Sequence, residues 1–175
     1  PGNGFGLCDG HTRDASVDYP PLTDWLTDVL DDLAGLPKQV KPLTFGDLWG
    51  DTAVELAKAL DLKEKKGAAP IEDRIAALEA RRIDLEVMTT NLTFRRPYRF
   101  PFSSRIFYFC EKRLRVYFPG YVVDHLVGAS APAPDGKDGD HIVAMRCPCH
   151  GEQVRSLPDP WDIPVVMAAR MRRCG

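Results

Sequence analysis

The residue types best suited to chemistry gather in the segment Cys147-Pro148-Cys149-His150-Gly151. Its spelling matches one ligand box of a Rieske iron–sulfur centre, which needs two Cys and two His from two boxes. The other box requires a Cys two residues before a His, and Val123 occupies that position ahead of His125. For zinc, this segment supplies at most three tightly spaced ligands. We therefore expect a surface turn with no bound metal or cofactor, and the alternative is a metal or redox protein using Cys147, Cys149 and His150.

A second short segment, Gly128-Ala129-Ser130-Ala131-Pro132, nearly spells the G-x-S-x-G nucleophile elbow. That elbow requires a small residue at its last position because the strand-to-helix turn is tight, and Pro132 stands there instead. The acid–glycine pairs at Asp135 and Asp138 are typical of tight turns. We therefore assign no catalytic residue to this chain.

Charge is distributed unevenly along the 175 residues, although the net charge is only −2. Residues 1–62 carry eleven acids and four bases, whereas residues 94–118 carry seven bases and one acid among many aromatic rings. Such a basic–aromatic tract can bind phosphates, single-stranded nucleic acid or anionic lipid surfaces. The alternative is a strand whose rings point inward and whose arginines point outward. The ordinary overall composition argues against a disordered chain and a nucleic-acid partner.

Hydrophobic periodicity predicts a mixed α/β chain. Apolar residues recur at helical spacing over 22–33, 71–81 and 111–127, with a break or kink at Pro119-Gly120. Further helices are expected over 51–62 and from Asp162 to Arg172. Strands are expected over 83–90, 97–102 and 141–145, and a flexible insertion is expected over about 128–140. A connector over 36–50 is expected to anchor itself in the core through Leu43, Phe45, Leu48 and Trp49.

Several segments, in order along the chain, resemble bacterial patatin-like phospholipases. They are Gly6-Leu7-Cys8-Asp9-Gly10, Leu43 to Leu48, Ile83 to Thr93 with Arg96 to Phe102, Phe107-Tyr108-Phe109 with Leu114 to Val123, and Leu157 to Met171. The resemblance implies a serine lipid acyl hydrolase on an α/β/α layered scaffold, with a Ser–Asp dyad. In that family the oxyanion loop and serine precede the matching region and the aspartate follows it, so no catalytic residue is carried over.

The resulting prediction is a single incomplete patatin-like domain spanning 1–175, inactive as this chain alone and lacking the dyad. The alternative is a non-catalytic module that binds lipid or protein. Expected partners are a lipid or membrane surface and the missing remainder of the domain. The five cysteines do not form a disulfide framework, which favours reduced thiols and a cytoplasmic location, with membrane association through the basic tract.

Overall fold

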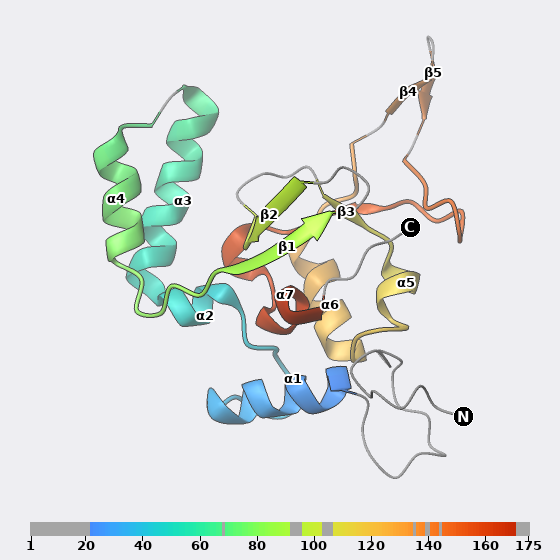
Figure 1. Ribbon diagram of the computed structural model, residues 1–175. Helices are drawn as coiled ribbons and strands as arrows, with labels where there is room; N and C mark the ends of the chain where they lie inside the picture. Colours follow the sequence, from blue (N-terminus) through green and yellow to red (C-terminus); the bar gives the residue numbers. More distant parts are fainter. Residues whose placement is uncertain are drawn as a thin grey trace. The chain divides into compact units, whose positions relative to one another are not determined.

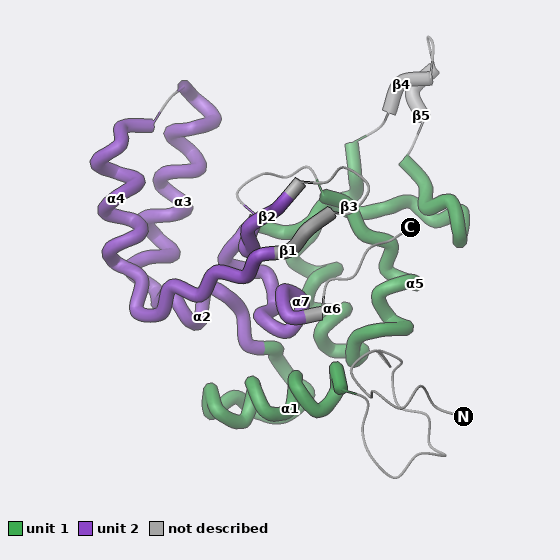
Figure 2. Tube along the Cα trace, in the orientation of Figure 1, with its two compact units in different colours: residues 1–42, 103–159 green, residues 43–102, 160–175 purple. Residues whose placement is uncertain are grey.

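The computed structural model describes residues 22–67, 69–91, 96–102, 107–134, 136–138, 141–143 and 145–170. Backbone contacts divide the chain into two compact units (Figure 2). Unit 1 comprises residues 1–42 and 103–159, and unit 2 comprises residues 43–102 and 160–175.

Unit 2 combines helices with an antiparallel pair of strands (Figure 1). Its elements are α2 (Phe45–Trp49), α3 (Asp51–Lys66), α4 (Ile71–Glu79), β1 (Val87–Asn91), β2 (Arg96–Phe100), the 3-10 helix η1 (Pro160–Asp162) and α7 (Val165–Arg170). Strands β1 and β2 pair antiparallel, with Val87 opposite Phe100 and Asn91 opposite Arg96. Figure 1 shows α3 and α4 as an antiparallel helical hairpin.

The core of unit 2 forms where residues 43–45 meet the chain at 163–165. The Phe45 N–H donates to the Ile163 carbonyl at 3.0 Å, and the Val165 N–H donates to the Leu43 carbonyl at 2.8 Å. Phe45 is fully buried and its ring lies 6.2 Å from that of Phe100. A capping box between Thr44 and Asp47 starts α2 by satisfying two backbone N–H groups.

Unit 1 contains the remaining elements. They are α1 (Leu22–Leu33), β3 (Tyr108–Phe109), α5 (Glu111–Leu114), α6 (Gly120–Ala129), β4 (Gly136–Asp138), β5 (His141–Val143) and β6 (Arg155–Ser156). Strand β3 pairs antiparallel with β6, and β4 pairs antiparallel with β5. Helix α6 buries three side chains spaced along one face, namely Val122, Val123 and Leu126.

Several predicted helices and strands are confirmed as such, but their first and last residues differ from the prediction. The Pro119-Gly120 break does separate two helices, α5 and α6. The 36–50 connector contains α2, which the periodicity did not predict, and α3 continues four residues past Leu62. Asp162 belongs to η1 and not to the N-cap of α7. The part of the 128–140 insertion that the structure describes includes β4.

Two apolar helix faces that the periodicity predicts are exposed. On α4 the side chains of Ile71 and Ile75 are 68% and 48% exposed. On α1 the exposed fractions of Trp25 and Leu33 are 50% and 82%. Ile83, expected in the strand over 83–90, is exposed and precedes β1.

The mixed α/β class is confirmed. The expected α/β/α layering is not seen, because each sheet formed by the described residues has two antiparallel strands. Within the same residues, no helix is both long and apolar enough to cross a bilayer.

Candidate metal centre

The segment 145–154 folds back on itself as a narrow turn. The Cys147 N–H donates to the Glu152 carbonyl at 2.7 Å, and the Val154 N–H donates to the Met145 carbonyl at 3.0 Å. At the tip, the Gly151 N–H donates to the Cys147 carbonyl at 2.8 Å. Gly151 has a φ of +68°, a left-handed conformation that glycine adopts without steric cost. This turn places Cys147 and His150, three residues apart, on the same side of the chain.

Cys110 comes to the same place from a distant part of unit 1. It follows β3 directly and is the N-cap residue of α5, where its carbonyl accepts the Leu114 N–H at 3.1 Å. Both thiols are buried, with 7% of Cys110 and 5% of Cys147 exposed, in a small cluster with Ala133 and Val154. An ion pair of 3.1 Å between Lys112 Nζ and Glu152 Oε1 links α5 to the same turn.

The three side chains form a compact set of metal-binding atoms. The Nδ1 atom of His150 lies 3.6 Å from the Cys110 sulfur and 3.7 Å from the Cys147 sulfur. All three donor atoms lie within 4.8 Å of one another. The two sulfurs come from segments separated by nearly forty residues, so tertiary folding alone creates this arrangement.

The electrostatic environment differs between the two thiols. Interaction with the His150 side chain lowers the pKa of the Cys147 thiol to about 7, with backbone N–H groups of the turn acting in the same direction. Burial raises the pKa of the Cys110 thiol. One thiol therefore reaches the metal-binding thiolate form more easily than the other.

The structure changes the expected ligand set. Cys149 lies outside the three-residue cluster; it is exposed, and its sulfur lies 3.7 Å from Arg113 Nη1. The grouping of Cys147, Cys149 and His150 as ligands is therefore wrong in one member. Sequence reasoning missed Cys110, because the local spacing gives no signal for a cysteine 37 positions before Cys147.

Ser130 takes part in capping contacts at the end of α6. Its hydroxyl lies 3.3 Å from the Val127 carbonyl and 3.0 Å from Arg155 Nε. The Arg155 guanidinium also donates to the backbone carbonyls of Val127 and Ser130. Asp135 lies outside the described residues.

The basic–aromatic tract is described in part. Its rings at Phe100, Phe102 and Phe109 are 7% exposed or less, so they belong to the protein core. Arg99 is exposed and forms a 3.0 Å ion pair with Glu86. These contacts favour the inward-ring, outward-arginine interpretation, while the lipid partner remains a prediction.

Comparison with known proteins gives a relative of limited coverage. No family model matches the chain, and no solved structure matches it. The chain is 33% identical over 171 residues to a protein named RpoH suppressor from Rhizobium meliloti (strain 1021). That alignment covers 97% of this chain and 22% of the relative, so the chain spans about a fifth of the relative's length.

These findings correct the expected identity and function. The patatin-like phospholipase resemblance is wrong. A relative that matches nearly the whole chain is named RpoH suppressor, a name that does not indicate a lipid hydrolase, and no family model matches. The associated predictions of lipid hydrolysis and lipid degradation are withdrawn with it.

Proposed function

We propose that this chain binds one zinc ion through Cys110, Cys147 and His150. The observation that carries the proposal is the convergence of two sulfurs and one imidazole nitrogen within 4.8 Å, from segments far apart in sequence. Zinc in proteins is bound by cysteine sulfur and histidine nitrogen in tetrahedral geometry. The ion would hold the 145–154 turn against the start of α5.

The separations of the donor atoms agree with a shared zinc ion. Bond lengths of about 2.3 Å to sulfur and about 2.0–2.1 Å to nitrogen, at a tetrahedral angle, place the two donor atoms roughly 3.5–3.6 Å apart. The distances from His150 Nδ1 to the two sulfurs are 3.6 and 3.7 Å. Both nitrogen–sulfur distances are therefore close to those expected for ligands of one zinc ion.

The composition of the site favours zinc over other divalent cations. Calcium and magnesium take oxygen ligands, whereas two thiolates and an imidazole suit zinc. Three protein ligands leave one tetrahedral position, which a water molecule can fill because His150 is exposed. The Lys112–Glu152 ion pair joins the same two segments, the turn and α5, that the ion would hold together.

The named relative supplies the wider setting for this site. By analogy with this relative, we propose that the chain is a segment of a larger protein that acts as an RpoH suppressor. The zinc ion would stabilise this segment of it. In a cell that depends on suppression by the full-length protein, Cys110→Ser should weaken suppression more than Cys149→Ser.

Metal analysis of the purified 175-residue chain tests the zinc site directly. We expect one equivalent of zinc per chain, lost on Cys110→Ser and His150→Ala. Cys149→Ser is the matched control, because it removes a thiol from the same turn that lies outside the cluster. Absence of stoichiometric zinc from the wild-type chain, or loss of zinc with Cys149→Ser and not with Cys110→Ser, would refute the proposal.

A further inference from the structure

Helix α1 presents its apolar stripe outward. Trp25 is 50% and Leu33 is 82% exposed, and between them Leu26, Val29 and Leu30 are only partly covered. The fully buried side chains of the helix are polar ones, namely Thr23, Thr27 and Asp31. This is the reverse of the usual arrangement, in which an amphipathic helix turns its apolar face to the core.

Specific contacts hold the helix in this orientation. The Tyr121 hydroxyl of α6 donates a hydrogen bond to Asp31 Oδ2 at 2.6 Å, and Asp31 is only 2% exposed. The Thr27 hydroxyl donates to the Thr23 carbonyl at 2.6 Å, which satisfies a second buried polar group. Rotating the helix to bury Trp25 and Leu33 would break the Asp31 contact and leave a buried tyrosine hydroxyl without it.

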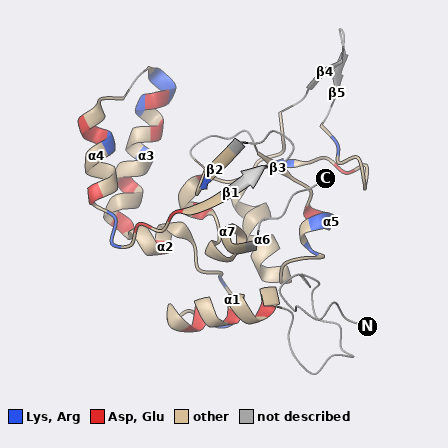
Figure 3. Cartoon of the chain, in the orientation of Figure 1, with Lys and Arg blue, Asp and Glu red and all other residues tan. Residues whose placement is uncertain are grey.

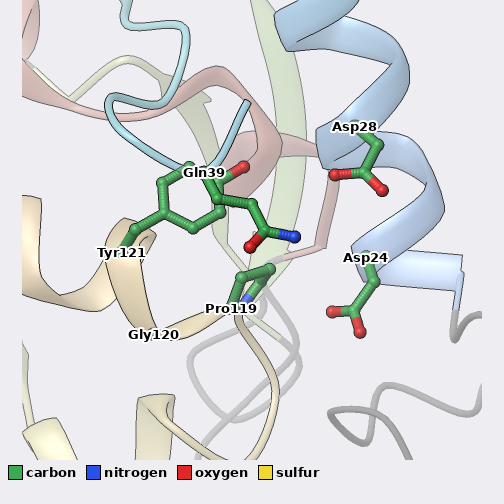
Figure 4. Close-up of a pocket in the computed structure, with 6 residues that line it drawn as sticks. All are labelled: Asp24, Asp28, Gln39, Pro119, Gly120 and Tyr121. Carbon is green, nitrogen blue, oxygen red and sulfur yellow. The ribbon is translucent and has the colours of Figure 1, made fainter. Parts of the chain in front are cut away.

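The same helix is strongly acidic. Four of its twelve residues are aspartates and none is Lys or Arg, as the red segments on α1 in Figure 3 show. Two of them, Asp24 and Asp28, line a cavity of about 380 Å³ together with Gln39, Pro119, Gly120 and Tyr121. In Figure 4 the two carboxylates project from α1 on one side of the cavity, facing Gln39 and Tyr121.

We infer that α1 and this cavity dock a basic amphipathic helix of a partner protein. Its apolar side chains would cover the stripe from Trp25 to Leu33. A Lys or Arg side chain would enter the cavity beside Asp24 and Asp28. Recognition of an amphipathic helix through apolar anchors at helical spacing is a common mode of peptide binding.

Charge complementarity favours a basic helix over a second copy of α1 or a membrane surface as the binding partner. A basic helix complements the aspartates, which speeds encounter and excludes acidic competitors. A second copy of α1 would bring its own aspartates against Asp24, Asp28 and Asp32 of the first, and an anionic membrane surface would repel them in the same way. This inference does not depend on the zinc site.

Binding of a designed peptide to the full 175-residue chain tests the inference. The probe is a fluorescently labelled 14-residue amphipathic helix of Leu and Lys, and its partner probe has Glu in place of each Lys. We expect the Lys peptide to bind at least about tenfold more tightly than the Glu peptide, with an affinity that falls as salt is raised.

Two variants locate the surface. Leu33→Ser and Asp28→Lys should each weaken binding of the Lys peptide, the second by about tenfold. Ile75→Ser is the matched control, because it alters an exposed apolar side chain on α4 and should leave binding unchanged. Circular dichroism verifies that each variant retains its helices.

Three results of the binding assay would overturn the inference. They are no binding of the Lys peptide, equal affinity for both peptides, and equal weakening by Ile75→Ser and Leu33→Ser. A dimer in light scattering that Leu33→Ser converts to a monomer would assign the stripe to a second copy, and that result would also overturn it.

Discussion

Zinc should stabilise this chain against thermal unfolding, and the size of the effect follows from the separation of its ligands. Cys110 and His150 are 40 residues apart. Closing a loop of that length in an unfolded chain costs roughly 4 kcal/mol in the chain-entropy treatment used for disulfides. The native fold has already closed it, so the folded chain should bind zinc more tightly than the unfolded chain by about that amount. By linkage, saturating zinc then stabilises the fold by up to roughly 4 kcal/mol.

The assay is thermal unfolding followed by circular dichroism, with the same preparation either stripped by a chelator or saturated with zinc. For a domain of this size, 1 kcal/mol corresponds to about 2–4 °C in Tm. We therefore expect zinc to raise Tm by roughly 8–16 °C. The difference between the two conditions is taken within each variant, so that any direct effect of a substitution on stability cancels.

Two cysteine variants make this measurement specific. Cys110→Ser should abolish most of the zinc-dependent rise in Tm, because it removes the ligand that closes the loop. Cys149→Ser should retain the full rise, since its thiol lies outside the cluster. A rise below about 2 °C in the wild-type chain would refute the reasoning. So would equal rises in the wild-type chain and Cys110→Ser, because the zinc would then act elsewhere.

Three further predictions concern the fold. Tyr121→Phe should lower the free energy of unfolding by about 1.5–3 kcal/mol near neutral pH, because it removes the hydroxyl that donates to buried Asp31. Burial and Asp31 raise the pKa of Tyr121. The stabilisation by its hydroxyl is therefore complete below the unfolded-state pKa of about 10 and is lost progressively as pH rises above that value. In urea unfolding, the free energies of unfolding of the wild-type chain and Tyr121→Phe should be closer at pH 11 than at pH 8. Gly46→Ala should destabilise α2, because a Cβ there would lie 2.8 Å from the Trp161 carbonyl oxygen, and an unchanged Tm would contradict this contact. Leu126→Ala should cost about 2–5 kcal/mol in chemical denaturation because that side chain is fully buried, and a cost under 1 kcal/mol would show that the site collapses around the smaller residue.

Local signals in the sequence predicted where several elements begin and end. Gly35 follows α1 with a φ of +67°, and the Pro119-Gly120 pair separates α5 from α6. These signals work because proline and glycine act on their own backbone, whatever surrounds them. The anchors Phe45 and Trp49 were also predicted from the sequence, since large apolar side chains in a polar connector gain most from burial.

The direction in which each helix faces was not predictable in the same way. The period of the apolar residues on α1 and α4 correctly predicts helices, but it gives only a relative preference for one face. On α1 the buried contact between Asp31 and Tyr121 fixes the opposite face inward, and those two residues are 90 positions apart. Such a contact leaves no periodic trace in either segment.

At the metal centre, too, local sequence predicts one part of the structure and tertiary contacts decide the rest. The sequence by itself determined one half of it, because Cys147, His150 and Gly151 form a turn whose geometry depends on adjacent residues. Only the tertiary structure decided that Cys110 completes the cluster and that Cys149 does not. The physical reason is that metal binding requires donor atoms within a few ångströms of one ion. Pairing of β3 with β6, which sets Phe109 opposite Arg155, brings Cys110 at the start of α5 within that distance, and this pairing joins segments far apart in sequence.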